Sequence, residues 1–408
     1  MSHWFAKSRS FMEPIWKRLL IGSFAVAVVA GTVACSGGAT TVAQPTTKPA
    51  APAAAAPTSV PTTAPAATPA APAPTKAASA ANVTGAKELS GAGASFPYPL
   101  YSKWFDVYDK EKGVKVNYQS VGSGAGIKQL IEKTVDFGAS DAVMSDDQVK
   151  QAGGGDVHHI PTVMGAVVVT YSVQGVDKPL NLTPETVAGM FLGEIKRWND
   201  PKIAADNPDV KLPDTAIAVV HRSDGSGTTS IFTDYLSNVS TTWKSKVGMG
   251  TSVNWPVGLG AKGNEGVAGQ VKQTPGSVGY VELAYAIQTK LPYATLKNQA
   301  GKFVEATLGS TTEAAASAAA NMPADLRVSL VNAPGDKSYP IVGFTWLLAH
   351  KEQANGPKGK AVVDMLWWGI HDGQKYANDL LYATLPADVV KKAETMIKTI
   401  TFQGQPLY

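Results

Sequence analysis

The chain is poor in cysteine, since Cys35 is the only one among its 408 residues. A disulfide needs two cysteines, so no bond of this kind can link one part of the chain to another. The chain also has little excess charge of either sign, because its 36 basic residues nearly balance its 32 acidic ones and leave a net charge of +4. No dense basic run with interleaved aromatic residues occurs, and this balance argues against a nucleic-acid-binding protein.

Several short motifs of common enzyme classes are also missing. No G-x-S-x-G segment is present, which argues against the nucleophile elbow of an α/β-hydrolase. The segment from Gly122 to Lys128 fits neither the P-loop pattern G-x-x-x-x-G-K-[ST] nor G-x-G-x-x-G. No histidine is evidently paired with a serine, no carboxylate cluster indicates two metal ions, and the adjacent His158 and His159 are too few ligands for zinc. We therefore expect no catalytic residue, no metal and no cofactor.

Long apolar runs are limited to residues 19–33, which are too few to span a membrane comfortably. This run follows a basic segment and ends at Thr32-Val33-Ala34-Cys35, which resembles the cleavage and lipidation site of bacterial lipoproteins. Thr32 departs from that pattern, which prefers an aliphatic residue there. We predict a signal peptide over residues 1–35 with lipidation of Cys35; an uncleaved anchor or an incidental thiol is the alternative.

Residues 36–82 are rich in alanine, proline and threonine, a composition that cannot build a packed core and predicts a disordered tether. From residue 83 onwards, strand-like runs alternate with helix-like runs. The pairs are 114–118 with 127–135, 165–171 with 183–192, and 217–220 with 228–236. This alternation predicts an α/β architecture with mostly parallel sheets, and the length allows two lobes. Thr183 is the expected N-cap of the second helix, and Gly193 its expected end.

Three glycine-rich turns contain hydroxyl residues, and each precedes a helix-like segment. They span residues 90–97, in which Pro97 suits an early helical position, 121–126 and 221–229. Free N–H groups at a helix N-terminus attract anions, and small residues let an anion approach the backbone. Arg222 adds a two-pronged cationic donor, and Asp141 adds a carboxylate at the end of a strand-like segment. The sequence therefore predicts a site for a small, highly charged oxyanion in a cleft between two α/β units.

These turns and their flanks resemble the phosphate-binding proteins of phosphate-specific ABC importers, the PstS family. The matching segments are SGAGASFPYPLYSKWF, VNYQSVGSGAG, VDFGASDA, AVVHRSDGSGTT, NWPVGLGAKGNEGVA, GSVGYVELAYA and TFQGQPLY. They run from about Leu89 to Tyr408. The resemblance implies a type II periplasmic-binding-protein fold with two α/β lobes and a ligand cleft between them. We place lobe 1 at residues 83–172 and 336–408, and lobe 2 at residues 173–335.

The resemblance also implies which residues contact phosphate: Ser95, Phe96, Ser123, Asp141, Arg222, Ser226, Gly227 and Thr228. Phe96 would contribute its backbone N–H, and Asp224 would orient the guanidinium of Arg222 or cap the following turn. A carboxylate at Asp141 favours a ligand that donates a proton to it, which phosphate can do near neutral pH and sulfate cannot. His221 stands where the family commonly has arginine, and we expect it to make no ligand contact.

The expected protein is a bacterial, lipid-anchored, extracytoplasmic receptor that closes its lobes on one inorganic phosphate in a hinge motion. As a monomer, it would deliver the phosphate to a membrane permease powered by a cytoplasmic ATPase. We expect no covalent chemistry and no nucleic-acid partner. The alternatives are a binder of another oxyanion such as sulfate, arsenate or molybdate, a phosphate-ester hydrolase, and a surface or adhesion protein. Asp141 argues against a fully deprotonated ligand.

Overall fold

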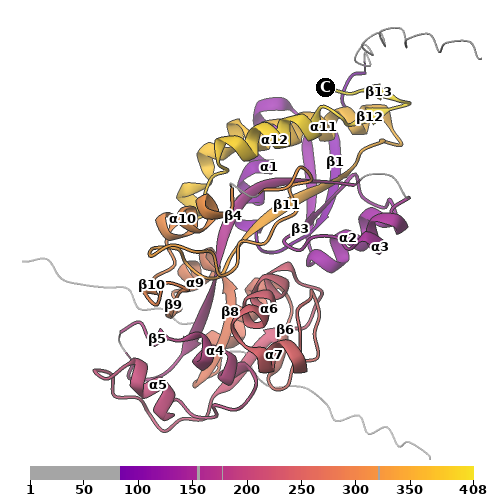
Figure 1. Cartoon of the computed structure of the whole chain (residues 1–408). Helices are drawn as coiled ribbons and strands as arrows, with labels where there is room; N and C mark the ends of the chain where they lie inside the picture. The colour runs from indigo at the N-terminus through magenta and orange to yellow at the C-terminus, as the bar shows by residue number, and fades with distance from the viewer. Residues whose placement is uncertain (1–82, 154–156, 177, 320–321) are drawn as a thin grey trace, which may run out of the picture. The chain divides into compact units, whose positions relative to one another are not determined.

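The computed structural model describes residues 83–408 except 154–156, 177 and 320–321 (Figure 1). The predicted signal peptide, the lipidation site Cys35 and the tether lie outside the described residues. The described residues belong to one compact unit, Ala73–Tyr408. In this part of the chain, no helix combines the length and the apolar character that a membrane crossing needs.

A mixed eight-stranded sheet organises the fold, with the strand order β2-β1-β3-β11-β4-β8-β6-β7 (Figure 1). Its strands are β1 (Glu88–Gly93), β2 (Lys115–Ser120), β3 (Phe137–Ser140), β4 (Val157–Ser172), β6 (Ala218–Arg222), β7 (Leu259–Ala261), β8 (Ser277–Glu282) and β11 (Val342–His350). The pairs β1–β2, β1–β3, β6–β7 and β6–β8 are parallel, whereas β11–β3, β11–β4 and β4–β8 are antiparallel. The predicted parallel pairing is therefore correct for the strand pairs near both edges of the sheet and wrong for the pairs in its centre. There β11 returns from a distant part of the chain, which local periodicity does not indicate.

Strand β4 belongs to both parts of this sheet. Its 16 residues are buried except for the last one, as expected for a strand that is covered on both faces. The first part of β4, up to Ala166, pairs with β11, and the part from Val167 to Ser172 pairs with β8. Strands β1, β2, β3 and β11 thus form the sheet of one α/β lobe, strands β6, β7 and β8 form that of the other, and β4 joins them.

The remaining elements surround this sheet. The helices are α1 (Tyr98–Lys112), α2 (Ser123–Ile131), α3 (Asp146–Gln151), α4 (Pro184–Phe191), α5 (Pro201–Asp206), α6 (Gly227–Val239), α7 (Thr241–Lys246), α8 (Gly263–Gln273), α9 (Leu283–Thr289), α10 (Leu308–Ala319), α11 (Gly356–Ile370) and α12 (Ala387–Ile397), with 3-10 turns η1 (Asp372–Tyr376) and η2 (Asn378–Leu380). The short strands are β5 (Asn181–Leu182), β9 (Thr295–Lys297), β10 (Phe303–Val304), β12 (Thr401–Phe402) and β13 (Gln405–Pro406).

Local signals locate both ends of α4 correctly. Thr183 caps α4 by accepting a hydrogen bond from the N–H of Thr186, and Gly193 follows the helix with a φ of 71°. Two expectations are wrong by a few residues. Pro97 is the N-cap of α1 rather than a residue inside it. Helix α2 ends at Ile131, before Val135, because the backbone turns left-handed at Lys133, where φ is 55°.

The C-terminal helices pack as their apolar spacing predicts. Val389, Ala393 and Ile397 of α12 are buried, at the helical spacing of three to four residues. Trp368 of α11 is buried, and its ring contacts that of Tyr108 at a centroid distance of 5.3 Å. This part of the chain therefore completes the core beneath the first lobe rather than the anion site.

Candidate functional site

The three glycine turns join strands to helices at the junction of the two lobes. The first turn lies between β1 and α1, the second between β2 and α2, and the third between β6 and α6. Asp141 follows the end of β3 directly. Because β1, β2 and β3 run parallel, their carboxyl ends share one edge of the sheet. This arrangement brings Ser95, Ser123 and Asp141 to the same edge.

Ser123 connects the two lobes through its hydroxyl group. Its Oγ accepts hydrogen bonds from the N–H of Gly227 at 3.0 Å and from the N–H of Asp141 at 3.2 Å. A hydroxyl oxygen has two lone pairs and one O–H, so these bonds use its acceptor capacity. The O–H of Ser123 is left to donate, and Asp141 Oδ2 lies 3.5 Å away. Ser123 is therefore a hydrogen-bond donor toward the site.

Asp141 is a buried carboxyl group, with only 3% of the residue exposed. Its Oδ1 accepts from Thr345 Oγ1 at 2.8 Å. The register of β11 shifts between Thr345 and Trp346, an irregularity of the kind that re-aims side chains beside functional sites. Burial raises the pKa of Asp141 to about 7, against the lowering effects of Thr345, Arg222 and Ser123. This carboxyl group is thus an acceptor that binds a proton more strongly than an exposed aspartate.

Arg222 is held by Asp224 along one edge of its guanidinium group. Nε donates to Asp224 Oδ1 at 2.7 Å and Nη2 donates to Oδ2 at 2.5 Å, while Nη1 lies 3.5 Å from Thr228 Oγ1. Burial alone would lower the pKa of Arg222, but the hydrogen bonds and charge of Asp224 raise it. Since a guanidinium has five N–H donors, one N–H on Nη1 and one on Nη2 remain for a ligand.

Asp224 contacts a second partner as well. Its Oδ1 accepts from the backbone N–H of Gly263 at 3.2 Å, at the start of α8. Burial would raise the pKa of this carboxyl group, but the hydrogen bonds and charge of Arg222 hold it below the usual value. Asp224 therefore loses its proton more readily than an exposed aspartate. Both of its oxygens are engaged, so it orients Arg222 and links the third turn to α8.

The start of α6 approaches Asp141 and Ser123 closely because Gly227 has no side chain. A Cβ on Gly227 would lie 2.5 Å from Asp141 Oδ2 and 2.6 Å from Ser123 Oγ. Ser226 is the N-cap of α6, and its Oγ accepts from the N–H of Thr229 at 3.0 Å. The positive end of the α6 dipole therefore points into the same space as Arg222.

Ser95 and Phe96 complete the site from the first turn. Ser95 Oγ accepts from the side-chain amide of Asn264 at 2.9 Å and from its N–H at 3.2 Å. The carbonyl group of Ser95 accepts from the hydroxyl of Tyr285 at 2.6 Å. The Phe96 ring is fully buried, and a Cβ on Gly165 of β4 would lie 2.6 Å from it. This ring therefore packs under the turn.

Sequence reasoning missed two side chains that touch the predicted site. Asn264 contacts Ser95 and Thr228, and Thr345 donates to Asp141. Asn264 lies within the matched segment NWPVGLGAKGNEGVA, although nothing in that segment marks it as a hydrogen-bonding centre. Thr345 lies in the fully buried part of β11, and the single hydroxyl in an otherwise apolar strand was the only available signal.

His221 and His159 contact aromatic and backbone groups. His221 stacks on Trp255 at a centroid distance of 4.8 Å, and its Nδ1 lies 3.0 Å from the carbonyl oxygen of Arg222. His159 Nε2 accepts from the N–H of Met144, and burial lowers the pKa of His159 to about 4. Within the described ranges, no cluster of three or more histidine, cysteine or acidic residues could hold a metal ion.

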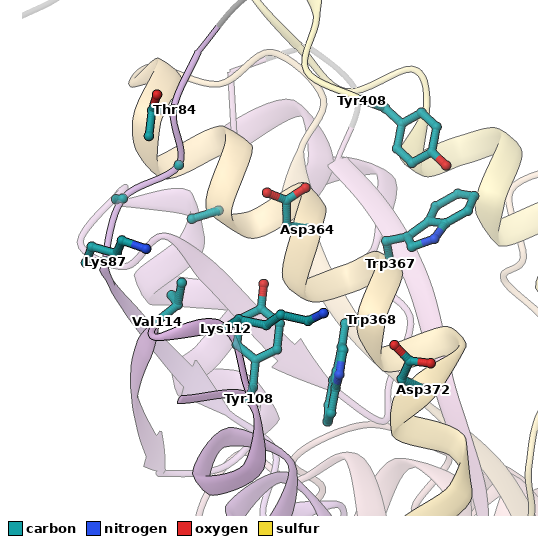
Figure 2. A pocket seen from close by; sticks show the side chains of 13 residues that line it. Thr84, Lys87, Tyr108, Lys112, Val114, Asp364, Trp367, Trp368, Asp372 and Tyr408 are labelled. Atoms are coloured by element: carbon teal, nitrogen blue, oxygen red, sulfur yellow. The ribbon is translucent and has the colours of Figure 1, made fainter. Parts of the chain in front are cut away.

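A surface pocket of about 450 Å³ lies away from these residues (Figure 2). Lys87, Lys112, Asp364 and Asp372 line it together with aromatic side chains, and none of the predicted phosphate ligands does. Figure 2 shows Trp367 beside Tyr408, and their ring centroids are 4.3 Å apart. The pocket offers as many carboxylates as lysines, so its charge does not suit an oxyanion.

Comparison with known proteins identifies relatives that span most of the chain. The family model of the PBP superfamily domain matches residues 61–366. The phosphate-binding protein PstS of Xylella fastidiosa is 46% identical over 315 residues, which are 77% of this chain and 86% of that protein. PstS of Methanocaldococcus jannaschii is 42% identical over 333 residues, with 75% of this chain and 85% of that protein covered.

Solved structures have the same fold. The phosphate-binding protein from Stenotrophomonas maltophilia matches with a TM-score of 0.57 at 21% identity, over 76% of this chain and 94% of that one. A candidate phosphate ABC transporter substrate-binding protein from Clostridium perfringens, solved with bound phosphate, has a TM-score of 0.54 at 16% identity, over 73% and 100% of the two chains. At such identities the likeness establishes the fold alone.

Proposed function

The chain belongs to the PstS family of phosphate-binding proteins, and we propose that it is a receptor that binds one inorganic phosphate and delivers it to an ABC importer. The observation that carries this proposal is the position of Ser123. Its hydroxyl accepts from Gly227, at the start of α6 and 104 residues away in sequence. It also accepts from Asp141, which follows β3 and lies 18 residues away. Donors from both lobes and one buried carboxyl group thus meet at one point.

The balance of donors and acceptors at this point suits phosphate. Arg222 supplies a fixed positive charge with two free N–H groups, and Ser123 supplies an O–H donor. The α6 dipole adds partial positive charge. Against these donors stands the carboxyl group of Asp141, and when it is ionised a bound anion can approach it favourably only by donating a proton to it. Phosphate carries such a proton near neutral pH and sulfate does not, so we propose that Asp141 is the selectivity element.

The proposed ligands are the residues expected from the family motifs: Ser95, Phe96, Ser123, Asp141, Arg222, Ser226, Gly227 and Thr228. Lobe 1 comprises residues 83–172 and 336–408, and lobe 2 comprises residues 173–335. The contacts of Ser123 with Gly227 support closure of these lobes around the ligand. Binding rather than catalysis is the proposed activity, because the polar groups hold the anion and none is arranged to attack it.

The cellular setting follows the family. Members of the PstS family are substrate-binding receptors outside the cytoplasm, and we propose that this chain is held at the outer face of the membrane by lipid on Cys35. Residues 36–82 would act as the tether between that anchor and the folded lobes. The receptor would act as a monomer and dock on the permease subunits of the importer, whose ATPase lies in the cytoplasm.

Isothermal titration calorimetry of the purified full chain, freed of bound anions, tests the proposal. We expect tight one-to-one binding of phosphate and no detectable heat with sulfate at matched ionic strength. Equal binding of both anions would refute the role of Asp141, and binding of sulfate alone would favour a different oxyanion receptor. Release of phosphate from a chromogenic phosphate ester would favour the hydrolase alternative, and we expect none.

A further inference from the structure

Asn264 is a fully buried residue whose polar groups are all engaged at the junction of the lobes. Its Oδ1 accepts from the backbone N–H of Glu282 at 2.9 Å. Since a backbone N–H can only donate, this contact fixes which end of the amide is oxygen. Nδ2 must then face the two hydroxyl groups on the other side, Ser95 Oγ at 2.9 Å and Thr228 Oγ1 at 3.0 Å.

Both hydroxyl oxygens consequently accept two hydrogen bonds. Ser95 Oγ accepts from Nδ2 and from the backbone N–H of Asn264, and Thr228 Oγ1 accepts from Nδ2 of Asn264 and from Nη1 of Arg222. A hydroxyl group can accept two hydrogen bonds and donate one, so each of these groups has only its O–H left. The two hydroxyls come from different lobes, in the first glycine turn and at the start of α6.

We propose that Asn264 is a positioning residue that turns the hydroxyls of Ser95 and Thr228 into obligatory donors, so that both can donate to a bound anion and neither can accept from it. This inference rests on the proposed function and deepens it. The ligand must present unprotonated oxygens to Ser95 and Thr228 and can place its proton only at Asp141. Asn264 thereby fixes where on the ligand the proton is allowed.

A thermodynamic cycle on phosphate affinity tests this role. In the otherwise unchanged chain, Asn264→Ala removes one of the two hydrogen bonds that each hydroxyl accepts, so each hydroxyl can again accept from a ligand. We expect the Kd for phosphate to rise about tenfold or more. In a chain that also has Ser95→Ala and Thr228→Val, the hydroxyls are gone, and we expect Asn264→Ala to change the remaining Kd by less than about twofold. An equal loss in both backgrounds would overturn the proposal, because it would mean that Asn264 acts through the packing of α8.

Reversal of the amide polarity gives a second readout. Asn264→Asp keeps the size of the side chain but replaces the donor by an acceptor, to which both hydroxyls would turn. We expect a larger loss of phosphate affinity than with Asn264→Ala, about 100-fold or more. An affinity equal to that of the unchanged chain would refute the proposal. Thermal unfolding without phosphate is measured for each variant, so that affinities are compared only among folded proteins.

Asn298 provides the matched control. It is also a buried asparagine, and its Nδ2 donates to the carbonyl oxygens of Gly335, Asp336 and Ser338 at 3.0 to 3.1 Å. We expect Asn298→Ala to lower the unfolding temperature without changing phosphate affinity. The unchanged chain separates the two hypotheses: no phosphate binding by it would refute the proposed function, whereas binding with an additive cycle would refute only the role of Asn264.

Discussion

Replacement of Gly227 by alanine is expected to weaken phosphate binding without lowering stability. Gly227 is the first residue of α6, where alanine is a better helix former than glycine by about 0.5 to 1 kcal/mol. Its φ is not in the left-handed region, so the backbone accepts a side chain. The new Cβ, however, would lie 2.5 Å from Asp141 Oδ2, whereas ordinary contact begins at 3.4 Å. The start of α6 must therefore withdraw from Asp141 by about 0.9 Å.

This displacement sets the expected loss of affinity. The bond from Gly227 N–H to Ser123 Oγ, now 3.0 Å, would stretch beyond the distance of a hydrogen bond. The proposed anion contacts of the α6 N-terminus would lengthen with it, and hydrogen bonds to charged groups contribute about 1.5 to 3 kcal/mol each. Loss of one such contact corresponds to about a 10- to 150-fold increase in Kd.

Two measurements on one sample check this reasoning, calorimetric titration with phosphate and thermal unfolding without it. Gly269→Ala is the matched control, since Gly269 also lies in a helix, α8, and an added Cβ would meet nothing within 4 Å. We expect the control to gain stability and to keep its affinity. Gly227→Ala should lose affinity without losing stability. Unchanged phosphate affinity in Gly227→Ala would show that α6 does not approach the anion as proposed.

Three further predictions concern side chains that can ionise. Arg222→Lys keeps the charge but loses the two-pronged contact with Asp224, so we expect the Kd for phosphate to rise about 10- to 100-fold. A change in Kd below threefold would contradict the role of the guanidinium geometry. Asp141→Asn replaces an acceptor by an amide that can also donate, so calorimetry should detect sulfate binding and weaker phosphate binding; continued rejection of sulfate would contradict the selectivity argument. The variant Glu282→Gln concerns stability. Glu282 is fully buried, and burial raises its pKa well above the ordinary value of 4.5. The folded chain therefore keeps a proton that the unfolded chain releases above that pH. The unchanged chain should lose unfolding free energy relative to Glu282→Gln by about 1.4 kcal/mol per pH unit above pH 4.5, until the folded-state pKa is reached. Urea unfolding between pH 5 and pH 7 measures this difference, and a difference independent of pH would contradict a buried, protonated Glu282.

Local sequence could predict the parts of the site that depend on neighbouring residues. The third turn contains Arg222, Asp224 and the cap of α6 within a few residues, and its glycines and hydroxyls predict an anion-binding turn. Helix starts such as Thr183 were predictable for the same reason, since capping is decided within one helical turn. The family motifs then indicated which turns act together.

Contacts between distant segments could not be predicted in this way. Asn264 bonds Ser95 across 169 residues, and Thr345 bonds Asp141 across 204 residues. The pairing of Asn264 depends on the placement of α8 against the first turn. The pairing of Thr345 depends on the return of β11 to the centre of the sheet. Asparagine and threonine have no spacing pattern that signals such a partner, so only the folded chain identifies them.

The long strand β4 has a mechanical consequence. Its ladder partner changes from β11 to β8 between Ala166 and Val167, so a bend at this point would fall between the two ladders. Some hydrogen bonds between the lobes lie far from this bend along the chain, such as the bond from Gly124 N–H to the carbonyl of Gly225 at 2.9 Å. Opening would break such bonds while β4 stays continuous, and a ligand that binds the closed form more tightly than the open form would shift the equilibrium toward closure.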